Sequence, residues 1–445
     1  MALKVLIRWE SQKPLLDEVL AEVLDKSVLP DPRDKALLTE MINGVVRHLS
    51  FLDYQISRVS RTPLEKMDPE VRNTLRLGAY QIFFTRIPPN AAVNETVNIL
   101  KRKRGKWITG LINAVLRELL RKQKNPALPP KEMDPIAYLA VKYSYPRWLV
   151  KRWLERFGFE ETEALLAAGN KRPPLVVRAN TLRVSRDQLL LYLQGEVPEA
   201  EATLYSPEGI VLRGFRGRIS KLKAFKVGWL LVQDEASQLV SHVVAPRPGE
   251  RILDACAGVG GKATHLAQLM RNTGRIYALD LYPWRLKRLQ ENAQRLGVTN
   301  IEVMAMDATQ ALETLGGNFF NRLLIDAPCT GTGIIRRHPD IKWARRPEDL
   351  QHGPEKQYRL LSSLAPLLKA GGVLVYATCS LEPEENELLI ARFLEEHPQF
   401  SLEDPRPDLP RTARELVDEK GFLRTYPHRH HLDGFFTARL RKKAL

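Results

Sequence analysis

Apolar residues recur at helical spacing through the first 125 positions of the chain. Over residues 108–120 positions three and four apart are apolar without interruption, at Ile108, Leu111, Ile112, Val115, Leu116, Leu119 and Leu120. This spacing places apolar side chains on one face of an α-helix. Similar stripes run through residues 15–24 and 37–46. The pattern predicts an all-α helical bundle over residues 1–125.

The pattern changes twice after the bundle. A proline-rich stretch at residues 126–136 predicts a linker. Residues 137–168 regain helical spacing, and short strands punctuated by glycine follow as far as residue 232. We therefore expect a small α+β domain over residues 137–230.

From residue 249 onward, strand-like and helix-like stretches alternate. The expected strands are 251–256, 275–280, 301–307, 322–326 and 373–377, and the expected helices are 262–271, 284–296 and 355–368. Such alternation predicts a doubly wound, mostly parallel sheet, and hence a Rossmann-like α/β domain over residues 231–445. The tail at 433–440 has strand character with no helix after it, so we expect a last, antiparallel strand.

The net charge of the chain indicates what class of partner it binds. The 445 residues hold 68 Lys+Arg against 52 Asp+Glu, a net charge of +16, which favours a polyanionic partner. Residues 1–125 carry 22 of the basic and 14 of the acidic residues, and five basic residues crowd into 101–106 beside Trp107. That cluster is either a solvated loop or an edge that contacts phosphates.

The cysteine count and the apolar runs limit the class of protein. Three cysteines are too few for a disulfide framework or a four-cysteine zinc site, so we expect a reducing cytosol and no metal. The sequence has no run of 18 apolar residues and no recognisable signal peptide, so we expect no membrane association.

A glycine-rich loop, Asp254-Ala-Cys-Ala-Gly-Val-Gly-Gly-Lys262, follows the first strand of the α/β domain. Glycines between a strand and a helix let the backbone approach a ligand and offer free N–H groups. Asp280 ends the next strand, 19 residues beyond Gly261, where a carboxylate can hold ribose hydroxyls. Asp307 is suited to an adenine amino group. The loop is either a structural turn or a site for a nucleoside-containing cofactor, and the second reading is favoured.

Two cysteines follow the last two parallel strands of the same domain. Cys329 lies in Asp326-Ala-Pro-Cys-Thr-Gly-Thr-Gly333, and Cys379 lies in Ala377-Thr-Cys-Ser380. In an open parallel sheet the ligand crevice lies outside the carboxyl ends of the strands. We therefore expect both thiols to face one crevice beside the cofactor loop, although a single free cysteine is more often a buried packing residue.

The segments 254–265, 326–333 and 377–380 resemble the cofactor loop and the two cysteine motifs of the RNA 5-methylcytosine methyltransferases. Residues 232–237 and 337–343 also resemble that family, so the resemblance spans roughly residues 230–445. Residues 110–117 resemble the NusB-like helical RNA-binding domains. Val259 departs from the proline that the family loop usually has, which loosens the turn prediction but removes no charged or nucleophilic group.

The resemblance implies a cofactor, a mechanism and a substrate. The cofactor is S-adenosylmethionine, and the cytosine in small-subunit (16S) ribosomal RNA is single-stranded or flipped out. Cys379 is the nucleophile that adds to carbon 6, Asp326 bonds the ring nitrogen, and Cys329 assists product release. The expected cofactor contacts are Cys256, Ala257, Gly258, Val259, Gly260, Gly261, Lys262, Asp280, Asp307, Ala308 and Asp326.

Other readings stay open at this point. The substrate could be transfer RNA or large-subunit ribosomal RNA, or the chain could be a non-catalytic RNA-binding assembly factor. The short glycine loop and the paired cysteines speak against a nucleotide-dependent dehydrogenase. We expect a monomer. Basic residues and Trp343 within 336–346 are expected to place positive charge and a stacking ring near the crevice.

Overall fold

The computed structural model describes residues 1–13, 15–25, 31–101, 103–215 and 217–444. The chain divides into two compact units. The first comprises Met1–Lys171 together with Ile335–Arg345, and the second comprises Arg172–Ile334 together with Arg346–Leu445. None of the described helices is long and apolar enough to cross a membrane.

The first unit is helical, as the spacing of its apolar residues predicts. Asp31 and Asp68 cap two of its helices through their carboxylates, and a proline opens each of these helices. The predicted apolar stripes meet in one core, which includes Ile42, Ile112 and Leu116. The helices are α1 (Ala2–Gln12), α2 (Leu16–Asp25), α3 (Pro32–Arg47), α4 (Leu49–Ser57), α5 (Pro69–Phe84), α6 (Pro89–Lys101), α7 (Lys106–Lys122), α8 (Pro135–Lys142), α9 (Arg147–Asn170) and α16 (Ile341–Ala344).

The second unit begins with a small antiparallel sheet in the order β2-β3-β1-β4. A Ser185 capping box opens the helix that packs on this sheet. Leu189 and Leu193 of that helix join Val177 and Ile210 of the strands in a separate core, which confirms the predicted α+β class. The elements are β1 (Val176–Ala179), α10 (Arg186–Gln194), β2 (Ala200–Ala202), β3 (Gly209–Leu212), α11 (Lys223–Lys226) and β4 (Leu230–Val232).

The remainder of the second unit is a doubly wound sheet in the order β10-β12-β9-β8-β5-β6-β7, with β11 paired to β12. Its strands are β5 (Arg251–Asp254), β6 (Arg275–Asp280), β7 (Ile301–Ala305), β8 (Phe320–Asp326), β9 (Leu368–Thr378), β10 (Phe400–Leu402), β11 (Leu423–Thr425) and β12 (Phe435–Lys442). Strands β5 to β9 pair in parallel, and β12 runs antiparallel to β9, as the tail pattern predicts.

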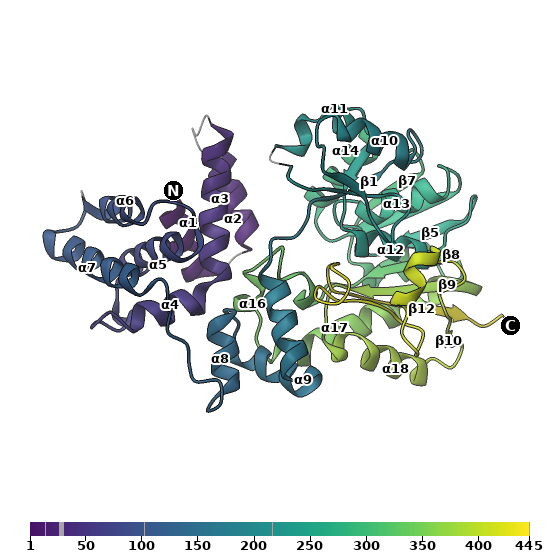
Figure 1. Ribbon diagram of the computed structural model, residues 1–445. Coiled ribbons are helices and arrows are strands. Elements are labelled where there is room, and N and C mark those ends of the chain that lie inside the picture. The colour runs from purple at the N-terminus through teal and green to yellow at the C-terminus, as the bar shows by residue number, and fades with distance from the viewer. Residues whose placement is uncertain (14, 26–30, 102, 216, 445) are drawn as a thin grey trace. The chain divides into compact units, whose positions relative to one another are not determined.

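Helices cover both faces of this sheet (Figure 1). Alternate residues of one strand enter opposite cores: Val373, Val375 and Ala377 face α12 and α13, while Leu374 and Tyr376 face α17 and α18. The helices are α12 (Glu235–Val244), α13 (Gly261–Leu269), α14 (Pro283–Leu296), α15 (Ala311–Leu315), α17 (Asp349–Leu364) and α18 (Glu387–Glu396). Helix α17 begins six residues before the predicted start, because Pro354 lies inside it rather than ahead of it.

Candidate active site

The two cysteines predicted to share a crevice lie side by side. Strands β8 and β9 are parallel neighbours in which Asp326 pairs with Ala377, so the chain leaves both strands at the same edge of the sheet. The sulfur atoms of Cys329 and Cys379 are 3.4 Å apart, which is hydrogen-bond distance for a thiol. The expectation that the strand ends bring the two sulfur atoms together is therefore confirmed.

A buried carboxylate fixes the loop that carries Cys329. Glu385 is fully buried and accepts hydrogen bonds from the backbone N–H of Thr330 at 2.8 Å, from its hydroxyl, and from Gln357 at 2.9 Å. The backbone N–H of Gly333 donates to the carbonyl of Cys379 at 2.9 Å and ties the two cysteine loops together. The relative position of the two sulfur atoms is therefore held by a network of satisfied buried hydrogen bonds.

The thiol pair is electrostatically asymmetric. The hydrogen bond to Cys379, together with burial, raises the pKa of Cys329 well above its ordinary value. Cys329 therefore keeps its proton and is suited to donate it toward the sulfur of Cys379. A thiol that accepts a hydrogen bond is easier to ionise, since the bond favours its charged form.

A buried lysine lies beside the cysteines. The Lys262 ammonium is 2.6 Å from a carboxylate oxygen of Asp326. Although burial lowers it, the pKa of Lys262 is raised overall, because the charge and hydrogen bond of Asp326 favour the ammonium and Asp254 and Cys379 add to the effect. Lys262 thus supplies a lasting positive charge next to a carboxylate and to the Cys379 sulfur.

The glycine-rich loop wraps around the end of β5 and starts α13. Gly258 and Gly260 adopt φ values of 55° and 88°, a region that side chains disfavour. The loop is anchored by Asp280, whose carboxylate accepts from the N–H of Gly258 at 3.0 Å and of Tyr282 at 2.9 Å. The pocket beside the loop is lined by Ser237, Asp254, Cys256, Ala257, Gly258, Val259, Gly261, Lys262 and Asp326.

Seven of the residues proposed as cofactor contacts from the sequence line this pocket. Among the others, Gly260 caps α13, and Asp280 holds the loop from the neighbouring strand. Asp307 accepts hydrogen bonds from the N–H and hydroxyl of Thr309, and Ala308 begins the 3₁₀-helix Ala308–Gln310. Asp280 ends β6, the strand next to β5, whereas Asp307 and Ala308 follow β7, the strand beyond β6.

The pocket contains two residues that the sequence reasoning did not select. Ser237 comes from α12, and Asp254 is the last residue of β5. Within the described part of the chain neither oxygen of Asp254 makes a well-formed hydrogen bond. Burial raises the pKa of Asp254 to about 7, and the nearby Asp326 adds to the shift. Its position at the start of the glycine-loop motif was the signal in the sequence that could have identified it.

Two residues of the basic stretch after the Cys329 motif, Lys342 and Trp343, bond backbone carbonyls of the helical unit. Residues 335–345 belong to the first unit. Lys342 is 1% exposed and donates to the carbonyl of Arg47, and the Trp343 indole donates to the carbonyl of Val46 at 2.7 Å. Both carbonyls lie at the end of α3, where helices leave acceptors unsatisfied. The prediction that Lys342 supplies a free charge and Trp343 a free stacking ring is therefore wrong.

The other basic cluster is exposed at the start of α7. Lys101 and Lys106 are exposed, and Trp107 is 74% exposed, so this edge is open to a ligand. Arg104 pairs with Asp68 and Glu70, which reduces the local positive charge. Arg102, part of the predicted cluster, lies outside the described residues.

Three stretches of the chain match models of known protein families. Residues 241–441 match the 16S rRNA methyltransferase RsmB/F family, and residues 1–121 match the NusB family. Residues 145–217 match the ferredoxin-like domain of RsmF/B-like methyltransferases. The fold class expected from the sequence is therefore confirmed: a NusB-type helical domain, a small α+β domain of ferredoxin-like type, and an α/β methyltransferase domain.

Relatives match over nearly the full length. The chain is 38% identical to the probable ribosomal RNA small subunit methyltransferase B of Bacillus subtilis, covering 100% of this chain and 98% of the relative. It is 39% identical to ribosomal RNA small subunit methyltransferase B of Pseudomonas putida, covering 98% of this chain and 96% of the relative.

Two solved structures are similar to most of this chain. A methyltransferase homologue from Pyrococcus horikoshii is 32% identical with a TM-score of 0.60, covering 71% of this chain and 100% of its own. NSun6 from the same organism, solved with SFG, is 26% identical with a TM-score of 0.60, covering 67% and 99%. The chain belongs to the ribosomal RNA small subunit methyltransferase B family.

Proposed function

We propose that this protein methylates carbon 5 of a cytosine in 16S ribosomal RNA, in the cytoplasm, with S-adenosylmethionine as the methyl donor. The observation that carries the proposal is the thiol pair Cys329 and Cys379, 3.4 Å apart, in the same unit as the Lys262–Asp326 ion pair. Two thiols, an ammonium and a carboxylate form a set suited to covalent activation of a pyrimidine ring.

The pocket beside the glycine-rich loop suits the cofactor. Gly258 and Gly261 line the pocket without a side chain, which allows close approach to the backbone. Asp280 keeps lone pairs for the ribose hydroxyls after accepting from Gly258 and Tyr282. Asp307 and Ala308 follow the next strand, where the adenine ring would bind. S-adenosylmethionine would supply an electrophilic methyl group on its sulfonium sulfur.

Cys379 is the nucleophile in this proposal. Carbon 5 of cytosine belongs to an electron-poor ring and does not attack a methyl group directly. When the Cys379 thiolate bonds to carbon 6, the electron pair of the 5,6 double bond becomes available at carbon 5 as in an enamine. Cys329 donates its proton toward Cys379 and Lys262 adds positive charge, so both favour the thiolate.

Asp326 and Lys262 hold the proton that neutralises the cytosine ring nitrogen. Addition at carbon 6 builds negative charge that reaches the ring nitrogen, and a shared proton there neutralises it. The Lys262 ammonium is hydrogen-bonded to Asp326, so the pair can hold that proton between them. After methylation the carbon 5 proton leaves to a base and the carbon 6–sulfur bond breaks. Cys329, as the neighbouring acid, assists that release.

The first unit offers a surface for RNA. Exposed lysines at 101 and 106 flank an exposed Trp107, a combination that can contact phosphates and stack on a base. A base within a duplex hides carbon 6, so the target is single-stranded or flipped out.

Methyl transfer gives the direct test of this function. Tritium from labelled S-adenosylmethionine should enter unmodified 16S ribosomal RNA, and bisulfite mapping should locate the product at a cytosine. No incorporation into this RNA would favour a non-catalytic assembly factor. Incorporation only into transfer RNA or large-subunit RNA would correct the substrate.

The cysteine roles are tested separately. Cys379→Ala should abolish methyl transfer and form no covalent RNA adduct. Cys329→Ala should instead accumulate an adduct that survives a denaturing gel, because addition proceeds while release stalls. The opposite pattern would reverse the two assignments.

A further inference from the structure

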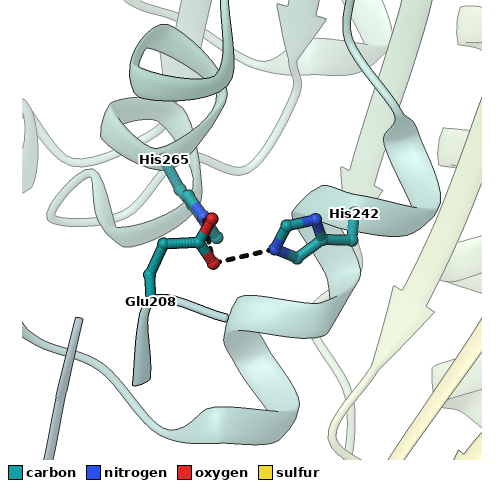
Figure 2. A group of neighbouring side chains, drawn as sticks. All are labelled: Glu208, His242 and His265. Carbon is teal, nitrogen blue, oxygen red and sulfur yellow. Dashed lines mark hydrogen bonds and ion pairs between the residues drawn. The ribbon is translucent and has the colours of Figure 1, made fainter. Parts of the chain in front are cut away.

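Three potential metal ligands meet beside α13, apart from the residues that line the cofactor pocket (Figure 2). Glu208 lies just before β3, His242 lies on α12 and His265 lies on α13. Glu208 is 7% exposed and His265 is fully buried. All three belong to the second unit, and none takes part in the proposed methyl transfer.

The three donor atoms are close enough to share one ion. The Nε2 atom of His242 is 2.9 Å from a carboxylate oxygen of Glu208, and the Nε2 atom of His265 is 3.7 Å from the same oxygen. One ligand atom from each residue lies within 4.8 Å of the others. Ligands bound tetrahedrally at 2.0–2.2 Å lie roughly 3.4 Å apart, so small side-chain adjustments would complete the geometry.

His265 is the member of this cluster whose polar atoms lack hydrogen bonds. Within the described part of the chain, neither of its buried ring nitrogens makes a hydrogen bond. Buried polar groups without a hydrogen bond are rare in native proteins. A neutral imidazole has one ring nitrogen with an available lone pair. A metal ion bound by that lone pair would remove the deficit at one nitrogen.

Glu208 supplies the negative charge that such an ion needs. One oxygen of the Glu208 carboxyl group lies 2.9 Å from the Nε2 atom of His242 and 3.7 Å from that of His265, so it faces both imidazoles. The Ser206 hydroxyl donates its one proton to Gln238 at 2.6 Å or to the Glu208 oxygen at 3.3 Å. Outer hydrogen bonds of this kind orient ligands in metal sites.

A counter-ion role for Glu208 is the competing explanation. The fully buried Arg178 interacts electrostatically with Glu208 and lowers the pKa of His265. Arg178 is otherwise held by Gln233, by the carbonyl of Gly261 at 2.7 Å and by Thr264 at 3.0 Å. Charge compensation accounts for a buried Glu208 but leaves the nitrogens of His265 without a partner.

We propose that Glu208, His242 and His265 bind one divalent transition-metal ion, with Zn²⁺ the best match and water completing a tetrahedral site. Two imidazoles and a carboxylate are ligands that Zn²⁺ takes, whereas Mg²⁺ and Ca²⁺ require oxygen ligands. The ion joins the loop before β3 to α12 and α13. Lys262 lies one helical turn before His265, so the ion steadies the helix that presents Lys262 to the pocket.

Metal titration of the full-length protein tests this proposal. The catalytic thiols could also bind Zn²⁺, so the measurement uses the Cys329→Ala/Cys379→Ala double variant, stripped with a chelator. Calorimetric titration should show one Zn²⁺ site and no Mg²⁺ site. Co²⁺ should give the visible absorption of a tetrahedral site without a sulfur-to-cobalt charge-transfer band.

Ligand variants identify the site. His242→Gln and Glu208→Gln, made in the same background, should each weaken Zn²⁺ binding by more than the roughly 10–100-fold that loss of an outer-shell partner costs. His352→Gln, at an exposed position on α17, is the matched control and should bind as the parent does. Circular dichroism checks folding, and the partly buried His242 is the variant least disruptive to the core.

Two results would overturn the proposal. One is the absence of a stoichiometric Zn²⁺ or Co²⁺ site in the folded double variant. The other is equal affinity in the His242→Gln, Glu208→Gln and control proteins, which would place the ion elsewhere. Either result leaves the cluster as a buried carboxylate that balances Arg178. Neither bears on methyl transfer, which is measured with the cysteines intact.

Discussion

Two buried ionisable groups, one in each unit, differ in how far their hydrogen bonds are satisfied. In the first unit, the buried Arg76 guanidinium is saturated: it bonds Asp53 twice at 2.7 Å and Glu10 once at 2.7 Å. Despite burial, Arg72 and Arg76 hold the pKa of Glu10 at about 2. In the second unit, Asp254 lacks a well-formed hydrogen bond within the described residues. A buried charge whose hydrogen bonds are made stabilises the fold. A buried ionisable group that lacks hydrogen bonds and lies in a pocket is available to a ligand or a proton.

Arg76→Met is the strongest test of the saturated network. It leaves Glu10 and Asp53 without their shared cation, so the first unit should lose about 3–5 kcal/mol of stability. Calorimetric melting of the full chain would show the loss as a lower-temperature transition. S-adenosylmethionine affinity should not change. A melting curve identical to the parent's would mean that the network stabilises little.

Lys262→Met tests the pocket side of the comparison. Without the ammonium, Asp326 loses its partner and Cys379 loses a neighbouring positive charge, so kcat should fall about 100-fold, within the range for a proton-transfer group. Single-turnover methylation measures the effect. Lys262→Arg, which keeps the charge, should recover part of the rate, and an unchanged rate for Lys262→Met would remove the lysine from the mechanism.

Asp254→Asn tests the unsatisfied carboxyl through its pH dependence. The folded pKa of about 7 lies above the ordinary 3.8, so the folded state holds the proton more tightly than the unfolded state. The contribution of Asp254 to stability is therefore fully present below about pH 4 and falls as the pH rises toward 7, by at most about 1.4 kcal/mol per pH unit. Denaturant unfolding across pH 4–8 should show this decline in the parent and a flatter curve in the variant. Parallel curves would contradict the prediction.

Substitution of the surface lysines should give the smallest effect. Lys101→Gln with Lys106→Gln should weaken RNA binding a few-fold and lower the salt dependence of the binding constant by about one unit of slope for each phosphate that is no longer neutralised. Filter binding at several salt concentrations measures both quantities. Lys420→Gln, an exposed lysine in the second unit, is the matched control. Equal effects of both changes would indicate nonspecific attraction.

The parts of the site that follow from strand order could be predicted from the sequence. Cys329 and Cys379 each follow a strand of a parallel sheet, and that rule alone placed them together. The spacing from Gly261 to Asp280 placed the Asp280 carboxylate beside the glycine-rich loop for the same reason, because adjacent parallel strands end at one edge of the sheet.

The parts that depend on packing between distant elements could not be predicted. Glu208 and His242 are 34 residues apart on a loop and a helix, so no spacing rule connects them. The expectation of no metal rested on the cysteine count, which carries no information about this cluster. Lys342 and Trp343 resemble a solvated basic run in the sequence, and only the end of α3 shows that they bond its carbonyls.

The excursion of residues 335–345 into the helical unit has a consequence for dissecting the protein. The chain passes between the two units at three peptides, after Lys171, after Ile334 and after Arg345. A single proteolytic cut after Lys171 would leave the fragments tethered. Deleting the first 171 residues would remove the carbonyls that Lys342 and Trp343 bond, 13 and 14 residues after Cys329. Loss of activity in such a truncation could therefore come from a disturbed Cys329 loop as well as from a missing RNA contact.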